Sequence, residues 1–175
     1  MRFGYYERLS TADKATYRAS DEVRELPLRE PGSLHGLVQG LQDSLATGEL
    51  RLATMSAQAL CDGLTVMCEV EPVRVEILAV RPTFVEGGEL HGLYRWGEEE
   101  GGPDGLGPPL IQVWMRTAAK ARVVAFRTFL RTLLHEVLHH LDLALLGLPQ
   151  SFHTQGFFAR ESSLFNQLVV PAMTL

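Results

Sequence analysis

The stretch that most constrains this chain is His135-Glu136-Val137-Leu138-His139, an H-E-x-x-H pattern within a helix predicted over residues 122–146. Positions four apart on an α-helix lie one turn apart on the same face, so the imidazoles of His135 and His139 converge. Two imidazoles at this spacing hold a metal ion, and Glu136 supplies the carboxylate with which zinc hydrolases take a proton from water. The pattern therefore predicts a metal site on this helix.

The helix around the motif is strongly apolar, which strengthens the metal interpretation over the alternative that the histidines serve only packing or solubility. Two imidazoles and a carboxylate are costly to bury in such surroundings unless something pairs them. The apolar positions are Phe126, Leu130, Leu133, Leu134, Val137, Leu138, Leu141 and Leu145.

A third metal ligand is needed, and the chain offers two candidates downstream. His153 lies beyond Gly147 and Pro149, which end the helix and turn the chain back. Glu161 lies further along the next predicted helix. An imidazole makes a three-histidine site, whereas a carboxylate makes the two-histidine, one-glutamate site of thermolysin-type enzymes. Spacing alone leaves both open.

The H-E-x-x-H run and the later run His153-Thr154-Gln155-Gly156-Phe157 resemble the SprT-like metallopeptidase family. That family combines H-E-x-x-H with a later histidine that opens a helix and has an aromatic residue four positions on. The resemblance covers roughly the last third of the chain. It implies that His135, His139 and His153 bind Zn²⁺ and that Glu136 is the general base. Glu161 and the apolar run after it are also similar to the ImmA/IrrE type, which uses an acidic third ligand, but the resemblance favours His153.

Composition and charge narrow the class of protein and its partners. At 175 residues and 46% hydrophobic, the chain is expected to form one soluble domain over 1–175. No run approaches the roughly 20 apolar residues of a membrane span and no signal peptide is visible, so we expect no membrane partner and a cytoplasmic location. The net charge of −5 and the absence of a basic block make a nucleic-acid partner unlikely. The expected partner is a protein or peptide substrate, and the oligomeric state stays open.

Hydrophobic periodicity predicts an α+β fold. The helical part, residues 1–70, serves as scaffold, and residues 71–175 form a zincin-like metallopeptidase core, as the resemblance implies. In that core a small mixed sheet of about three strands packs on the H-E-x-x-H helix. Early helices are predicted over 10–26, 33–48 and 56–68, strands over 72–81, 89–96 and 109–116, and a Gly, Pro and acidic loop over 97–109.

Five further polar residues lie where they could support a metal site. His140 points about 100° away from His139, which favours a supporting or surface position over a ligand. Asp142 shares the face of His135, where it either orients a ligand imidazole or ends the helix. His91, Tyr94 and Arg160 could stabilise an oxyanion, but such residues are more often ordinary packed or surface residues.

The sequence thus predicts a zinc-dependent metallopeptidase in which a metal-activated water, with Glu136 as general base, hydrolyses peptide bonds. One alternative is a catalytically silent zincin-fold binding protein. The other is a metallopeptidase in which Glu161 replaces His153 as third ligand, as in ImmA/IrrE-like or gluzincin-like enzymes.

Overall fold

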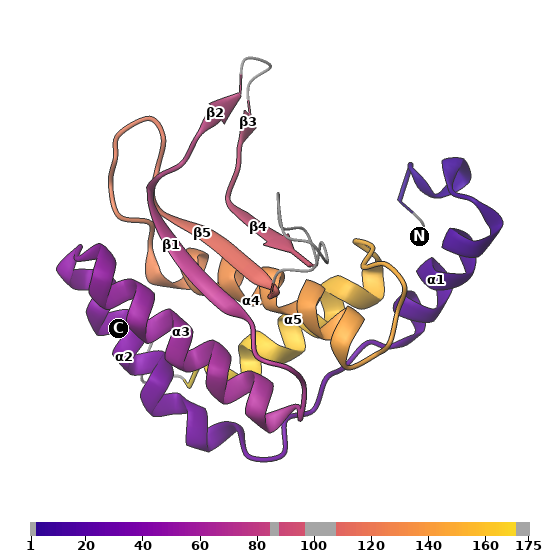
Figure 1. Cartoon of the computed structure of the whole chain (residues 1–175), viewed down its shortest axis with the longest axis horizontal. Helices are drawn as coiled ribbons and strands as arrows, with labels where there is room; N and C mark the ends of the chain where they lie inside the picture. The colour runs from indigo at the N-terminus through magenta and orange to yellow at the C-terminus, as the bar shows by residue number, and fades with distance from the viewer. Residues whose placement is uncertain (1–2, 85–87, 97–107, 171–175) are drawn as a thin grey trace.

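The computed structural model describes residues 3–84, 88–96 and 108–170, and the described chain has an α+β architecture (Figure 1). In chain order the elements are the 3-10 turn η1 (Tyr6–Arg8), α1 (Thr11–Glu22), the 3-10 turn η2 (Pro31–Leu34), α2 (His35–Thr47), α3 (Leu50–Met67), β1 (Arg74–Val80), β2 (Thr83–Phe84), β3 (Gly88–Glu89), β4 (Gly92–Arg95), β5 (Leu110–Arg116), α4 (Phe126–Ala144) and α5 (Gln155–Leu168).

The main sheet has the strand order β1-β5-β4, with β5 parallel to β1 and antiparallel to β4. This confirms the predicted small mixed sheet of three strands. The predicted strand over 89–96 is shortened, because Gly88–Glu89 pairs with Thr83–Phe84 in a separate two-stranded ribbon that the sequence did not indicate. In the part of the chain that the structure describes, β4 pairs with β5 alone and so forms an edge of the main sheet.

Side chains alternate between the two faces of each strand, and one face of the sheet is turned toward the helices. Val75, Ile77 and Ile111 are buried on that face, while Gln112 on the other face is hydrogen-bonded to Glu76. Directly opposite residues of an antiparallel pair share a face. Gly92 and Tyr94 of β4, which pair with Val113 and Ile111, therefore point toward α4, and α4 packs against both β4 and β5. One hydrophobic core runs through the early helices, this face and α4 and α5.

Individual residues at their ends define where α1 and α2 begin and stop. Ser10 caps α1, its Oγ accepting from the Asp13 backbone N at 3.1 Å. Gly48 ends α2 in the left-handed conformation at φ 73°. Helix α2 begins at His35 rather than at residue 33, because Pro31 opens a 3-10 turn in which the Ser33 hydroxyl donates to the Glu30 carbonyl at 2.8 Å.

The other boundaries shift by a few residues. Helix α3 begins at Leu50 rather than at residue 56, because buried Ala53 continues the apolar face backward. Helix α4 begins at Phe126 rather than at 122, because Val123 forms a β-bridge with Arg116 and keeps that stretch extended. Of the predicted loop 97–109, residues 97–107 lie outside the described residues. In the described part of the chain no helix has the length and apolar character needed to cross a membrane.

Candidate metal centre

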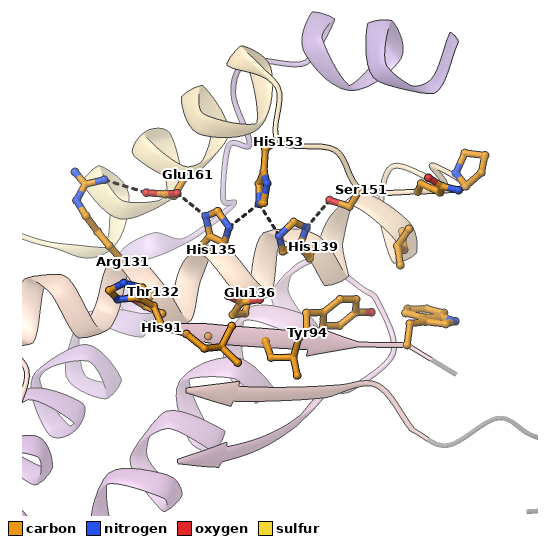
Figure 2. A pocket seen from close by; sticks show the side chains of 17 residues that line it. His91, Tyr94, Arg131, Thr132, His135, Glu136, His139, Ser151, His153 and Glu161 are labelled. Carbon is orange, nitrogen blue, oxygen red and sulfur yellow. Dashed lines mark hydrogen bonds and ion pairs between the residues drawn. The ribbon is translucent and has the colours of Figure 1, made fainter. Parts of the chain in front are cut away.

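Three histidines meet at one point, as the sequence predicted (Figure 2). The Nε2 atom of His153 lies 2.9 Å from Nε2 of His135 and 3.1 Å from Nε2 of His139. Helix α4 supplies His135 and His139 from consecutive turns, and the connection to α5 supplies His153. A tetrahedral zinc ion with bonds of about 2.0–2.1 Å separates its nitrogen ligands by about 3.3 Å, so this triad needs only a small expansion to hold one.

His153 is fixed just before α5 rather than inside it. Thr154 is the N-cap of α5, and its Oγ1 accepts from the Phe157 backbone N at 2.9 Å. The downstream histidine and the aromatic residue four positions on therefore flank a helix start, and the ring of Phe157 packs edge-on against His135 and lies 5.2 Å from His153. The helix start at Thr154 thus places His153 next to α4.

Glu161, the alternative third ligand, lies outside the triad. Its Oε2 is 3.0 Å from Nδ1 of His135, and its Oε1 is 3.2 Å from the guanidinium of Arg131 (Figure 2). A carboxylate at Nδ1 keeps the proton on that nitrogen and leaves the lone pair of Nε2 directed at the centre. Glu161 therefore orients the imidazole of His135 from its Nδ1 side, opposite the nitrogen that faces the triad.

His139 has a matching outer partner that the sequence analysis missed. The Ser151 hydroxyl donates to Oδ2 of Asp142 at 2.8 Å, so its oxygen accepts from Nδ1 of His139 at 2.7 Å. Asp142 thus orients a ligand imidazole, as one of its predicted roles required, but it acts on His139 through Ser151 rather than on His135. A serine two residues before the third histidine carries no spacing signal that could have identified it. The lone pairs of His135 and His139 both face His153, an arrangement that a cation satisfies.

Burial favours the uncharged form of His139 and His153. Desolvation, with the nearby His135 and His153 acting in the same direction, lowers the pKa of His139 to about 3. Desolvation also lowers the pKa of His153, with His135 adding to the effect. Neutral imidazoles are the form that binds metal, so few protons compete for these nitrogens near neutral pH.

Glu136 lies beside the triad and against the sheet. Its side chain is 7% exposed, and burial raises the pKa of its carboxyl to about 7, with His135 acting in the opposite direction. Gly92 of β4 crosses directly over it, because a Cβ built on Gly92 would lie 2.4 Å from Oε1 of Glu136. Glycine at this position leaves room for the carboxylate where it stands, and any larger residue would force the Glu136 side chain to move.

Tyr94 and His140 form a separate pair on the same face. The Glu71 carbonyl can only accept, so Nε2 of His140, 2.9 Å away, carries the proton. Burial lowers the pKa of His140 and keeps it neutral, so its Nδ1 accepts from the Tyr94 hydroxyl at 3.1 Å. The proton of Tyr94 is thus committed to His140, which argues against Tyr94 as an oxyanion donor. His140 is fully buried rather than on the surface.

The two other oxyanion candidates differ in position. His91 lines the cleft beside the triad and its side chain is exposed (Figure 2). Arg160 is fully buried and donates to Asp142 Oδ1 at 2.8 Å and to the Ser20 carbonyl at 2.6 Å. The guanidinium of Arg160 is thus turned away from the cleft, and Arg160 has the packed role rather than that of an oxyanion donor.

The triad and Glu136 open into a cleft of about 830 Å³. Its polar lining includes Arg131, Thr132 and Glu161. Its apolar and aromatic lining comprises Leu90, Leu93, Tyr94, Trp96, Leu143 and Pro149. A cleft of this size admits several residues of an extended peptide or a small molecule.

No protein-family model, curated protein or solved structure matches this chain. The likeness to SprT-like enzymes therefore rests on the motif residues of the sequence, and the interpretation of the site rests on its geometry.

Proposed function

We propose that this protein is a zinc-dependent metallopeptidase with a zincin-like catalytic domain. The observation that carries the proposal is the convergence of three Nε2 atoms beside a buried, cleft-lining carboxylate on the same helix. His135, His139 and His153 would hold the ion, and three protein ligands leave a fourth position for water or substrate, as in catalytic zinc sites.

The residues of the chain have distinct roles in this proposal. When bound, zinc lowers the pKa of water and polarises a substrate carbonyl. Glu136 accepts the proton from the attacking water and delivers it to the leaving amine. The Glu136 carboxylate would stay ionised at neutral pH if His135 and His139 held a dication, because a nearby positive charge would oppose the effect of burial on its pKa. Glu161 and Ser151 hold the imidazoles in the tautomer that binds metal.

Strand β4 supports a peptide as the substrate. Its partner β5 occupies one edge, and β4 residues Gly92, Leu93 and Tyr94 line the cleft. An extended peptide adds to such a strand through backbone hydrogen bonds, which brings its carbonyl beside the triad. The apolar lining at Trp96 and Leu143 favours an apolar substrate side chain.

Two features of the site favour turnover over a silent zinc-binding protein. A structural zinc site usually closes its fourth position with another side chain. Among the described residues, no fourth histidine, cysteine or carboxylate joins the triad. A structural site also has no use for a base. Glu136 is nevertheless present beside the triad, although burying its carboxylate is costly.

The test is peptide cleavage by the zinc-loaded protein and its Glu136→Gln variant, with a mixture of unfolded polypeptides as substrate and mass spectrometry of the products. The variant is expected to keep its zinc and to lose about 10²–10⁴-fold in cleavage rate, the usual contribution of a general base. Glu25→Gln, at an exposed glutamate outside the cleft, is the matched control and should cleave like wild type. Undiminished cleavage by Glu136→Gln would exclude the assigned base, and no cleavage by wild type would favour the silent alternative.

A further inference from the structure

The N-terminal arm, residues 3–23, lies against the segment that carries His153, although the two are far apart in the sequence. The arm comprises η1 and α1, and α1 packs on α5 (Figure 1). From the sequence, this region was expected to be scaffold. Its contacts are more specific than that role requires, because they gather on residues 152–160.

The first contacts act directly on the main chain at His153. The Tyr5 hydroxyl donates to the His153 carbonyl at 2.6 Å. The ring of Phe152 lies 6.5 Å from that of Tyr5 and 6.3 Å from that of Tyr17. The third histidine is thus held by its own carbonyl and through its neighbouring ring, both from the arm.

The second set of contacts fixes the start of α5. Oδ1 of Asp21 accepts from the Gly156 backbone N at 2.8 Å, and the Ser20 hydroxyl lies 3.3 Å from that of Thr154. A Cβ on Gly156 would lie 2.5 Å from the Ser20 carbonyl oxygen, so glycine is needed for the end of α1 to approach this closely. The arm therefore supplements the N-cap of the helix that follows His153.

A third route leads from the arm to His139. The guanidinium of Arg160 donates to the carbonyls of Ser20 and Val23 and to the carboxylate of Asp142. Asp142 in turn accepts from Ser151, which holds Nδ1 of His139. A continuous chain of hydrogen bonds therefore joins the end of α1 to a second member of the triad.

We propose that the N-terminal arm is a positioning element of the metal centre: it fixes His153 and His139 for metal binding through Tyr5 and Asp21, and through the carbonyls that bind Arg160 of α5. The inference rests on the proposed metal site but is separate from peptidase activity. It predicts that the affinity of the protein for metal depends on side chains far from the triad in sequence that never touch the ion. Loosening the arm weakens metal binding because the ligands must then be ordered when the ion binds.

The test compares Tyr5→Phe with Tyr6→Phe. Each variant removes one tyrosine hydroxyl from the same arm. The Tyr5 hydroxyl donates to the His153 carbonyl, whereas the Tyr6 hydroxyl accepts from Arg18 within the arm itself, so Tyr6→Phe is the matched control. A second pair is Asp21→Ala with Asp13→Ala, where Asp13 lies at the opposite end of α1. Zinc affinity is measured by competition with a chromophoric chelator, and the absorption spectrum of the Co²⁺-loaded protein reports the ligand geometry.

Tyr5→Phe and Asp21→Ala are each expected to weaken zinc binding about fivefold, the equivalent of one net hydrogen bond, and to alter the Co²⁺ spectrum. The controls should bind zinc like wild type. Thermal unfolding of the metal-free variants separates positioning from general stability, because a merely structural arm would lower the melting temperature and leave affinity and spectrum unchanged. That result, or equal weakening in variant and control, overturns the proposal while leaving the metal site intact. A wild-type protein that binds no metal would overturn the proposed function as well.

Discussion

Replacing Arg160 by methionine should destabilise this protein more than any single change at its surface. The guanidinium is fully buried, and it is 2.8 Å from Oδ1 of Asp142, which is also fully buried. Methionine keeps most of the apolar stem but leaves the carboxylate with Ser151 as its only partner among the described contacts. Removing one member of a buried ion pair costs about 3–5 kcal/mol, a large share of the roughly 5–15 kcal/mol of a typical domain.

At about 2–4 °C per kcal/mol for a chain of this size, the melting temperature of Arg160→Met should fall by about 6–20 °C. Urea unfolding of the metal-free protein at neutral pH, followed by circular dichroism, gives the free energy directly. Asp142→Asn combined with Arg160→Met removes the uncompensated charge, so the double variant should be at least about 1 kcal/mol more stable than the sum of the single losses implies. A loss under about 1 kcal/mol for Arg160→Met, or strictly additive losses, would refute the reasoning.

Three smaller changes examine other parts of the site. Gly92→Ala should displace the Glu136 carboxylate, which a Cβ would approach to 2.4 Å. The cleavage rate should then fall by about 10²-fold while the zinc content is kept. An unchanged cleavage rate would contradict the close approach. The pKa of His139 in the folded state, about 3, lies below its value of 6.5 in the unfolded chain, so the unfolded state binds more protons between these values. The metal-free protein should therefore lose stability as pH falls below 6.5, by up to about 1.4 kcal/mol per pH unit from this residue. Urea titrations at several pH values should show a shallower loss for His139→Gln, and identical slopes would reject the assignment. Tyr94→Phe should lower kcat less than about tenfold, because the Tyr94 proton is held by His140, whereas a loss of 10²–10³-fold would identify Tyr94 as an oxyanion donor.

Two members of the triad were predictable because their geometry is local. An H-E-x-x-H pattern brings His135 and His139 together through helix periodicity alone, whereas spacing left His153 and Glu161 both open and only the resemblance to SprT-like enzymes favoured His153. The α+β class and the three strands of the main sheet followed from the change between helical and alternating periodicity.

The supporting residues were not predictable, because they are set by tertiary contacts between distant segments. Asp142 was identified by its helical face, but its link to His139 passes through Ser151, which lies on another segment. Arg160 shows the same limit, since no pattern indicates that a buried arginine will bind the end of α1. The closeness of Gly92 to Glu136 likewise depends on how β4 packs on α4.

The most direct test of the three-histidine metal site is elemental analysis of purified wild type, His153→Ala and Glu161→Ala after exposure to zinc and removal of free metal. We expect one zinc ion per wild-type chain, none in His153→Ala, and retained zinc in Glu161→Ala, whose affinity should fall by about 10–100-fold because Glu161 only orients His135. Zinc that survives loss of His153 but not loss of Glu161 would contradict the assignment, and a wild type that takes up no metal would show that the histidines meet for another reason.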